Sequence, residues 1–131
     1  LCFKNLSLSK KKVARGLHYQ WDNPMGKLVR VVSGAAIDYF VDIRIDSPTF
    51  GQFGNILLSD ENKHQVYLPP GYAHGFVPLK DDTILNYKCT SYYNSEGESS
   101  INVFDSDLNL DLEKYVKNIT RRKNEKIFLL L

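Results

Sequence analysis

The chain has 131 residues, of which 43% are apolar and 24% are charged. This length and composition are typical of one soluble globular domain, so we expect a single domain over residues 1–131. An aromatic share of 12% supplies bulky side chains for a core and argues against disorder. No apolar run reaches the roughly 18–20 residues of a membrane-spanning helix, and we expect no membrane partner.

The net charge of +2 is spread unevenly along the sequence. The segment before residue 16 is purely basic, with Lys4, Lys10, Lys11, Lys12 and Arg15. Such a patch can bind nucleic acid or phosphate groups, or it can be a solvated surface. Because no helix-turn-helix, zinc-finger or RNA-binding motif accompanies it, we expect a solvated surface and no nucleic-acid partner.

Two cysteines, Cys2 and Cys89, are too few for a disulfide framework, and their spacing matches no zinc motif. We expect free thiols, which favour a reducing, cytoplasmic location.

Short β-rich segments follow one another from residue 28 to residue 104. Residues 28–32 and 36–45 flank a Ser33-Gly34 turn, which predicts a β-hairpin. Asp46-Ser47-Pro48 then ends the second strand. Further strands are expected over 50–58, 65–68, 75–79, 83–91 and 100–104.

The connections between these strands are shorter than the dozen or so residues that a parallel crossover needs. The sequence therefore predicts an all-β, antiparallel jelly roll of the sandwich or barrel type. Only residues 111–126 have apolar residues at helical spacing, and they predict a short C-terminal helix.

Three histidines are candidates for chemistry. His18 follows Arg15 and Gly16, and His74 lies in a turn after Pro69-Pro70-Gly71, whereas His64 is expected on the surface. A metal centre is not favoured, because the chain has no His-x-His pair and no evident third ligand.

Proton transfer next to a carbonyl group fits these residues better than metal chemistry. It needs a base, an acid on the opposite face, and a cation for the enolate oxygen. The sequence offers His18 as base, Tyr87 or Tyr93 as acid, and Lys27 or Arg15 as cation. Each residue also has an ordinary structural explanation, in the core or at a hairpin flank.

Seven short motifs occur in one order between Asn5 and Leu108. They are Arg15-Gly-Leu-His-Tyr-Gln20, Gly26-Lys-Leu-Val-Arg-Val31, Val41-Asp-Ile-Arg44, Ser47-Pro-Thr-Phe-Gly51, Leu58-Ser-x-Glu-Asn62, Pro70-Gly-Tyr-Ala-His-Gly-Phe76 and Tyr87-Lys-x-Thr-x-Tyr-Tyr93. This series resembles the dTDP-4-dehydrorhamnose 3,5-epimerases, the RmlC type of cupin.

The resemblance implies a homodimeric isomerase of deoxysugar biosynthesis that needs no metal or organic cofactor. Its substrate would be a nucleotide-linked 4-keto-6-deoxyhexose. By resemblance, His18 removes the C3 and C5 protons, Tyr87 returns a proton from the opposite face, and Lys27 stabilises the enolate oxygen.

The resemblance also implies residues that bind the sugar diphosphate: Arg15, His74, Tyr93, Asn5 and Gln20. The family orients its catalytic histidine with a C-terminal Asp, and Asn124 is the best positional match to it. We also expect the chain to lack the N-terminal strands of the family. Two alternatives stay open: an epimerase acting at C3 or C5 alone, and a non-catalytic protein that binds sugar nucleotides.

Overall fold

The computed structural model describes residues 3–11, 13–102, 108 and 118–119, with the backbone alone for 3–5 and 118–119. These residues form strands and one short 3-10 helix, and none of them lies in a helix that could cross a membrane. The elements are β1 (Phe3–Ser9), β2 (Val13–Gln20), β3 (Lys27–Ser33), β4 (Ala35–Asp42), β5 (Phe53–Ser59), β6 (Gln65–Leu68), β7 (Tyr72–Pro78), β8 (Thr83–Cys89), η1 (Ser95–Gly97), β9 (Glu98–Ser100) and β10 (Asn118–Ile119).

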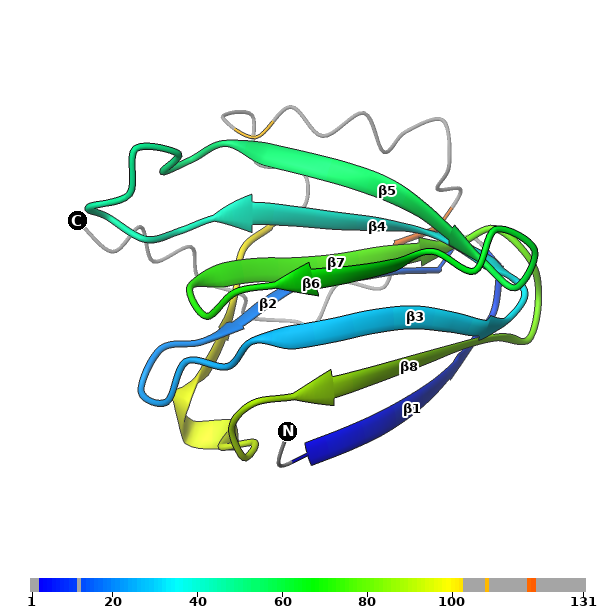
Figure 1. Ribbon diagram of the computed structural model, residues 1–131, viewed down its shortest axis with the longest axis horizontal. Coiled ribbons are helices and arrows are strands. Elements are labelled where there is room, and N and C mark those ends of the chain that lie inside the picture. The colour runs from blue at the N-terminus through cyan, green and yellow to red at the C-terminus, as the bar shows by residue number, and fades with distance from the viewer. Residues whose placement is uncertain (1–2, 12, 103–107, 109–117, 120–131) are drawn as a thin grey trace.

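The strands form two sheets that pack against each other (Figure 1). The four-stranded sheet has the order β1-β8-β3-β6. The six-stranded sheet has the order β10-β2-β7-β4-β5, and β9 pairs with the end of β2. Neighbouring strands are antiparallel except β10 and β2, which are parallel. The all-β fold predicted from the sequence is confirmed.

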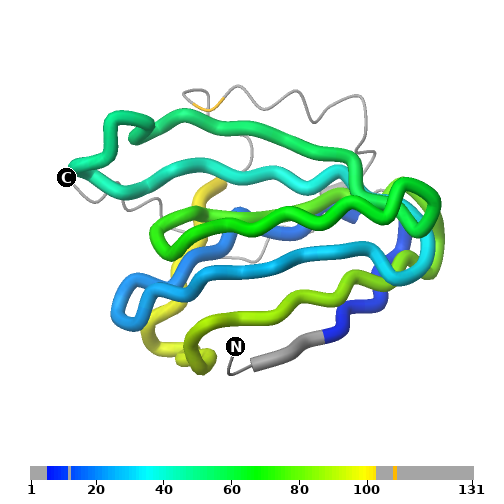
Figure 2. Tube along the Cα trace, in the orientation of Figure 1, coloured from blue at the N-terminus to red at the C-terminus, as the bar shows by residue number. Residues whose placement is uncertain are grey.

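The predicted hairpin around Ser33-Gly34 is wrong, because its two strands belong to different sheets. β3 pairs with β6 and β8, whereas β4 pairs with β5 and β7. Gly34, with a φ of +92°, carries the chain from one sheet to the other. Figure 2 shows that the connection from β7 to β8 crosses at the same end of the molecule. A turn motif reports that the chain reverses, but not whether the flanking strands pair.

The predicted helix over residues 111–126 is wrong at Asn118 and Ile119. These residues form β10 and pair in parallel with Val13 and Ala14 of β2. The rest of that segment lies outside the described residues. Pairing with a strand edge supplies the backbone hydrogen bonds that a helix would otherwise make internally, so tertiary contact overrides the local apolar period.

The remaining expected strands correspond to β5, β6, β7 and β8, with ends displaced by a few residues. The strand expected over 100–104 lies earlier, at β9, and residues 103–104 are outside the described part of the chain. β1 and β2 precede the first expected strand. In β2, Arg15 and Gly16 interrupt the apolar residues, which weakens the period-two signal that identifies a strand.

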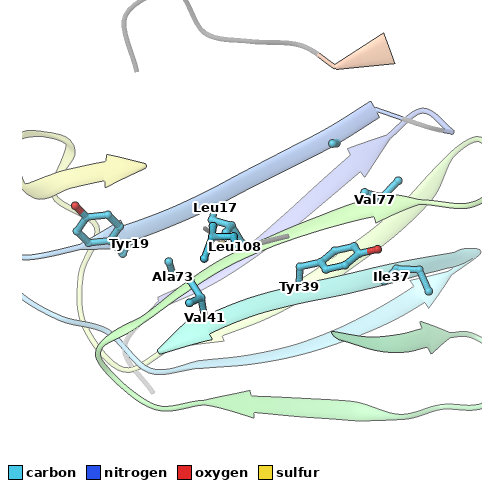
Figure 3. Packing of buried hydrophobic residues seen from close by; sticks show 9 residues of the cluster. Leu17, Tyr19, Ile37, Tyr39, Val41, Ala73, Val77 and Leu108 are labelled. Carbon is cyan, nitrogen blue, oxygen red and sulfur yellow. The ribbon is translucent and has the colours of Figure 1, made fainter. Parts of the chain in front are cut away.

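Two apolar clusters hold the fold together. The inter-sheet cluster lies between the sheets and contains Val29, Val31, Ala36, Leu58, Phe76 and Leu85. The outer cluster covers the other face of the six-stranded sheet and contains Ala14, Leu17, Tyr19, Ile37, Tyr39, Val41, Ala73, Val77 and Leu108 (Figure 3). β4 and β7 therefore bury apolar side chains on both faces, one in each cluster, whereas β2 contributes only to the outer cluster.

Candidate active site

The candidate site lies between the two sheets, toward the end where β2 leads into β3 and β6 leads into β7 (left in Figure 1). His18 is near the end of β2, Lys27 begins β3, and His74 is near the start of β7. The fold therefore brings together residues that are far apart in the sequence.

A β-bulge in β2 places Arg15 and His18 on the same face of the sheet. Arg15 pairs with Phe76, and His18 pairs with His74. Between these two pairs the chain advances three residues along β2 but only two along β7. Paired residues in antiparallel strands share a face, and Phe76 belongs to the inter-sheet cluster. In a regular strand, two residues three apart would lie on opposite faces.

Two glycines allow the close approach of β2 and β7 at this bulge. Gly16 has a φ of +99°, and a Cβ at this position would lie 2.5 Å from both the Cα of Gly75 and the carbonyl oxygen of His74. A Cβ on Gly75 would in turn overlap the carbonyl oxygen of Arg15. The bulge that aligns Arg15 with His18 therefore requires glycine on both strands.

A buried pair lies opposite His18. The Nε2 of His74 and the Oδ2 of Asp38 are 2.6 Å apart, and their side chains are 6% and 0% exposed. The second carboxylate oxygen, Asp38 Oδ1, is buried and has no hydrogen-bond partner among the described residues. The pair fixes the imidazole of His74 and leaves one acceptor oxygen in the interior.

Lys27 enters the site from the four-stranded sheet. It pairs with Cys89, and β3 turns Lys27, Val29 and Val31 toward the six-stranded sheet. Burial lowers the pKa of Lys27 below its ordinary value, while the nearby Cys89, Glu98 and Asp38 act to raise it. The ammonium group of Lys27 is therefore desolvated and lies near two carboxylates. A desolvated cation interacts more strongly with developing negative charge than a solvated cation does.

Tyr87 comes from the same face as Lys27. It is half-buried, pairs with Val29 of β3, and packs against the inter-sheet cluster. Its other register partner is Asn5 of β1, for which the structure describes only the backbone. Tyr87 is two residues before Cys89, the partner of Lys27 on β8, so Tyr87 and Cys89 share a face of that strand. Tyr87 therefore faces the six-stranded sheet.

Glu98 and the loop before it complete the site. The Nδ1 of His18 lies 3.9 Å from the Oε1 of Glu98, and the two side chains are 30% and 25% exposed. The hydroxyl of Tyr93 donates a hydrogen bond of 2.8 Å to Glu98 Oε2. Gln20 donates to the carbonyl oxygens of Asn23 and Tyr92, so its amide holds the loop that carries Tyr93.

The structure thus gathers most of the residues singled out from the sequence. His18, His74, Lys27 and Tyr87 face the space between the sheets, and Arg15 shares their side at the bulge. His64 is exposed, as expected, and lies directly before β6. Asn124 lies outside the described residues, so its expected role in orienting His18 stays a prediction.

Two carboxylates of the site were not identified from the sequence. Asp38 lies within Ala35-Ala-Ile-Asp-Tyr-Phe-Val41, and an acidic residue inside so apolar a strand is itself a signal of a special role. Glu98 has no such signal, because the polar segment before it resembles an ordinary loop. No group of three His, Cys, Asp or Glu side chains within the described ranges is arranged to hold a metal ion.

Comparison with known proteins identifies the same family along nearly the whole chain. A sequence model of the family described as dTDP-4-dehydrorhamnose 3,5-epimerase matches residues 1–130. An epimerase of this name from Methanothermobacter thermautotrophicus is 47% identical over 107 residues, covering 82% of this chain and 58% of the relative. Another from Salmonella typhimurium is 52% identical over 98 residues, covering 74% and 54%.

Solved structures give the same result. RmlC of Legionella pneumophila, described in complex with dTDP-4-keto-L-rhamnose, superposes with a TM-score of 0.84 at 47% identity, over 90% of this chain and 63% of that one. ChmJ of Streptomyces bikiniensis, described as a 3'-monoepimerase in complex with dTDP-quinovose, superposes with a TM-score of 0.84 at 33% identity, over 91% and 61%. The chain spans between half and two thirds of the length of these relatives.

Proposed function

The chain belongs to the dTDP-4-dehydrorhamnose 3,5-epimerase family, and from that premise we propose that it inverts C3 and C5 of a dTDP-linked 4-keto-6-deoxyhexose. The observation that carries the proposal is the arrangement across the two sheets. His18, beside a carboxylate, faces the sheet that presents Lys27 and Tyr87. A base, a cation and an acid on the opposite side are the groups that inversion next to a ketone requires.

The proposed steps follow from the chemistry of the ketone. The C4 carbonyl acidifies the protons on C3 and C5, and neutral His18 accepts one of them. The electron pair moves to the C4 oxygen, where the ammonium of Lys27 stabilises the enolate. Tyr87 then returns a proton to the opposite face of the planar carbon, which inverts it, and solvent restores the protonation states of His18 and Tyr87.

The binding roles are proposals as well. The guanidinium of Arg15 suits a diphosphate oxygen through its planar pair of donors, and His74 and Tyr93 are proposed to contact the sugar. Gln20 is proposed to act through the loop it holds, because its amide also accepts a hydrogen bond from the backbone N–H of Asn94. Asn5 is proposed as a substrate contact because it pairs with Tyr87 in β1.

We expect one domain, no cofactor, a cytoplasmic location and a homodimer. Leu6 and Leu8 support the dimer, because they are 62% and 63% exposed on β1, an edge strand of the four-stranded sheet. Exposed apolar side chains on a strand edge are typical of a surface that another chain covers. Size-exclusion chromatography with light scattering measures the oligomeric state directly.

An epimerase that acts at one carbon is the second candidate, since ChmJ is described as a 3'-monoepimerase. The carboxylate of Glu98 beside His18 favours either enzyme over a non-catalytic binding protein. Proton NMR in deuterated water with dTDP-4-keto-6-deoxyglucose distinguishes these functions. Loss of both the C3 and C5 signals is expected, loss of one would indicate the single-carbon enzyme, and binding without exchange would indicate the binding protein.

A further inference from the structure

We infer that Glu98 is a positioning residue for His18, and that the hydroxyl of Tyr93 holds the Glu98 carboxylate in place. The inference rests on the proposed function and adds to it a carboxylate supplied by β9, the strand that pairs with the end of β2.

The placement of Glu98 follows from strand register. β9 runs antiparallel to β2, and Glu98 pairs with Gln20 while His18 pairs with Ser100. Positions 18 and 20 share a face of β2, so Glu98 is directed to the side on which His18 lies. One carboxylate oxygen, Oε1, lies 3.9 Å from His18 Nδ1, and the other, Oε2, accepts the 2.8 Å hydrogen bond from Tyr93.

The loop before β9 fixes Tyr93 on both sides. Gln20 donates to the carbonyl oxygen of Tyr92 at 3.0 Å and accepts from the backbone N–H of Asn94 at 2.9 Å. Gln20 is itself buried. The tyrosine between these anchored neighbours is therefore presented to Glu98 by a braced loop, which lowers the entropic cost of holding the carboxylate in one orientation.

The chemistry of the contact assigns the two ring nitrogens. A carboxylate facing Nδ1 favours a proton on that nitrogen and leaves Nε2 as the acceptor for the substrate proton. When Nε2 takes up that proton, the imidazolium cation lies beside a negative charge. At 3.9 Å the contact is electrostatic rather than a hydrogen bond, and contacts of this kind shorten when substrate fills a site.

Other charged groups also face His18. His74 is its direct partner on β7 and is paired with Asp38, Lys27 approaches from β3, and Arg15 shares its face of β2. A change at Glu98 leaves all four in place. The effect of Glu98 is therefore separable from theirs by comparing single variants.

The test compares Glu98→Gln, Glu98→Asp and the matched control Glu96→Gln, an exposed glutamate two residues away in η1. For Glu98→Gln we expect kcat to fall roughly 10- to 100-fold with KM within about twofold. We also expect the acid limb of the pH profile of kcat/KM to move to lower pH, because the imidazolium loses its neighbouring carboxylate. Glu98→Asp should recover part of kcat, and Glu96→Gln should match the parent.

Tyr93 is tested in a double-variant cycle. If it acts through Glu98, Tyr93→Phe lowers kcat in the parent but has little further effect in the Glu98→Gln background. Independent, multiplying effects on kcat would overturn that part of the inference.

Failure of the inference and failure of the proposed function give different results. An active protein whose Glu98→Gln variant keeps the parent kcat and pH profile overturns the role of Glu98. If the parent exchanges neither sugar proton, the proposed function fails, and an NMR titration of the His18 ring still tests the contact. A lower titration midpoint in Glu98→Gln than in Glu96→Gln supports the contact, and equal midpoints overturn it.

Discussion

His18 and His74 are direct partners across two strands, yet their surroundings differ. His74 is 6% exposed and lies 2.6 Å from the carboxylate of Asp38. His18 is 30% exposed and meets a carboxylate only at 3.9 Å. A base has to reach its substrate and exchange protons with solvent, so the more open residue suits that role, whereas the buried pair suits a fixed contact.

Replacing His18 tests this assignment directly. His18→Ala removes the proposed base, so we expect exchange at both C3 and C5 to slow by about 10²- to 10⁴-fold. The measurement is the loss of the two proton signals in deuterated water. His64→Ala is the control, because His64 is exposed and outside the site. Parent-like exchange in His18→Ala would contradict the mechanism.

Tyr87→Phe separates proton removal from proton return. Because the phenol is the proposed acid, this variant should keep more of the exchange than of the net inversion. The ring stays in place against the inter-sheet cluster, so stability should change little. Exchange and product formation are followed in the same NMR experiment, and an equal loss of both would argue against a separate acid.

At the level of elements, the bulge in β2 is what aligns Arg15 with His18. We expect Gly16→Ala to be more destabilising than Gly51→Ala, although both glycines have a positive φ, of +99° and +78°. A Cβ at Gly51 meets nothing within 4 Å, so Gly51→Ala should lower the free energy of unfolding by about 1–2 kcal/mol, through backbone strain alone. Gly16→Ala should cost about 1–3 kcal/mol more, because the Cβ overlaps β7.

Denaturant unfolding of the two glycine variants measures this difference. Equal free energies of unfolding would mean that β2 and β7 separate at little cost, and that the bulge does not depend on a glycine.

The connection from β4 to β5 is organised by one carboxylate. Asp42 accepts hydrogen bonds from the backbone N–H, Nε and Nη2 of Arg44, and from the hydroxyls of Ser47 and Thr49. Arg44 also lies over the ring of Tyr72, 5.1 Å from its centroid. These contacts, with the Arg44 side chain first among them, hold the pKa of Asp42 well below its ordinary value of 3.8.

This shift gives the loop a pH-dependent stability. As the pH falls, Asp42 stays ionised in the folded state at pH values where the unfolded chain takes up a proton. The contribution of ionised Asp42 to the free energy of unfolding is therefore complete above the ordinary pKa of 3.8 and is lost as the pH falls below it. At pH 7 the parent should be about 1–3 kcal/mol more stable than Asp42→Asn. Urea unfolding at pH 7 and pH 3 should show that gap narrowing in acid.

The control for this pH dependence is Asp46→Asn, an exposed carboxylate of the same connection. It should change the free energy of unfolding at pH 7 by no more than about 0.5 kcal/mol. If the difference in free energy of unfolding between the parent and Asp42→Asn became larger in acid, the result would contradict the role given to ionised Asp42.

For the whole molecule, the packing between the sheets decides whether the two halves of the site face each other. Leu58 is fully buried in the inter-sheet cluster, while its neighbour Leu57 is 45% exposed. Leu58→Ala should cost about 2–5 kcal/mol through the cavity it leaves, and Leu57→Ala less than about 1 kcal/mol. Thermal and denaturant unfolding compare the two, and equal losses would contradict the assignment of the core.

The fold class could be predicted from the sequence, because short β-rich segments are local signals. Ordered motifs indicated the central catalytic candidates, whose roles stay predictions. Strand partners could not be predicted. The Ser33-Gly34 turn joins two sheets instead of two paired strands, and Asn118 and Ile119 pair with a strand more than a hundred positions earlier. Such pairings depend on packing between distant segments, which no local pattern encodes.

The same limit applies to the site. His18 was identifiable from its motif, whereas the carboxylate of Glu98 reaches it only because β9 pairs with β2 in a particular register. Tyr93 was a candidate from the sequence, but its hydrogen bond to Glu98 depends on how the intervening residues fold.

The pairing of β2 also bears on self-association. A strand at the end of a sheet exposes unpaired backbone groups that can template growth with another chain. β2 is next to last in its sheet, and β7 pairs along one of its sides. On its other side, β10 pairs with the start of β2 and β9 pairs with its end. The strand that carries Arg15, His18 and Gln20 is therefore shielded at both ends from edge-to-edge aggregation.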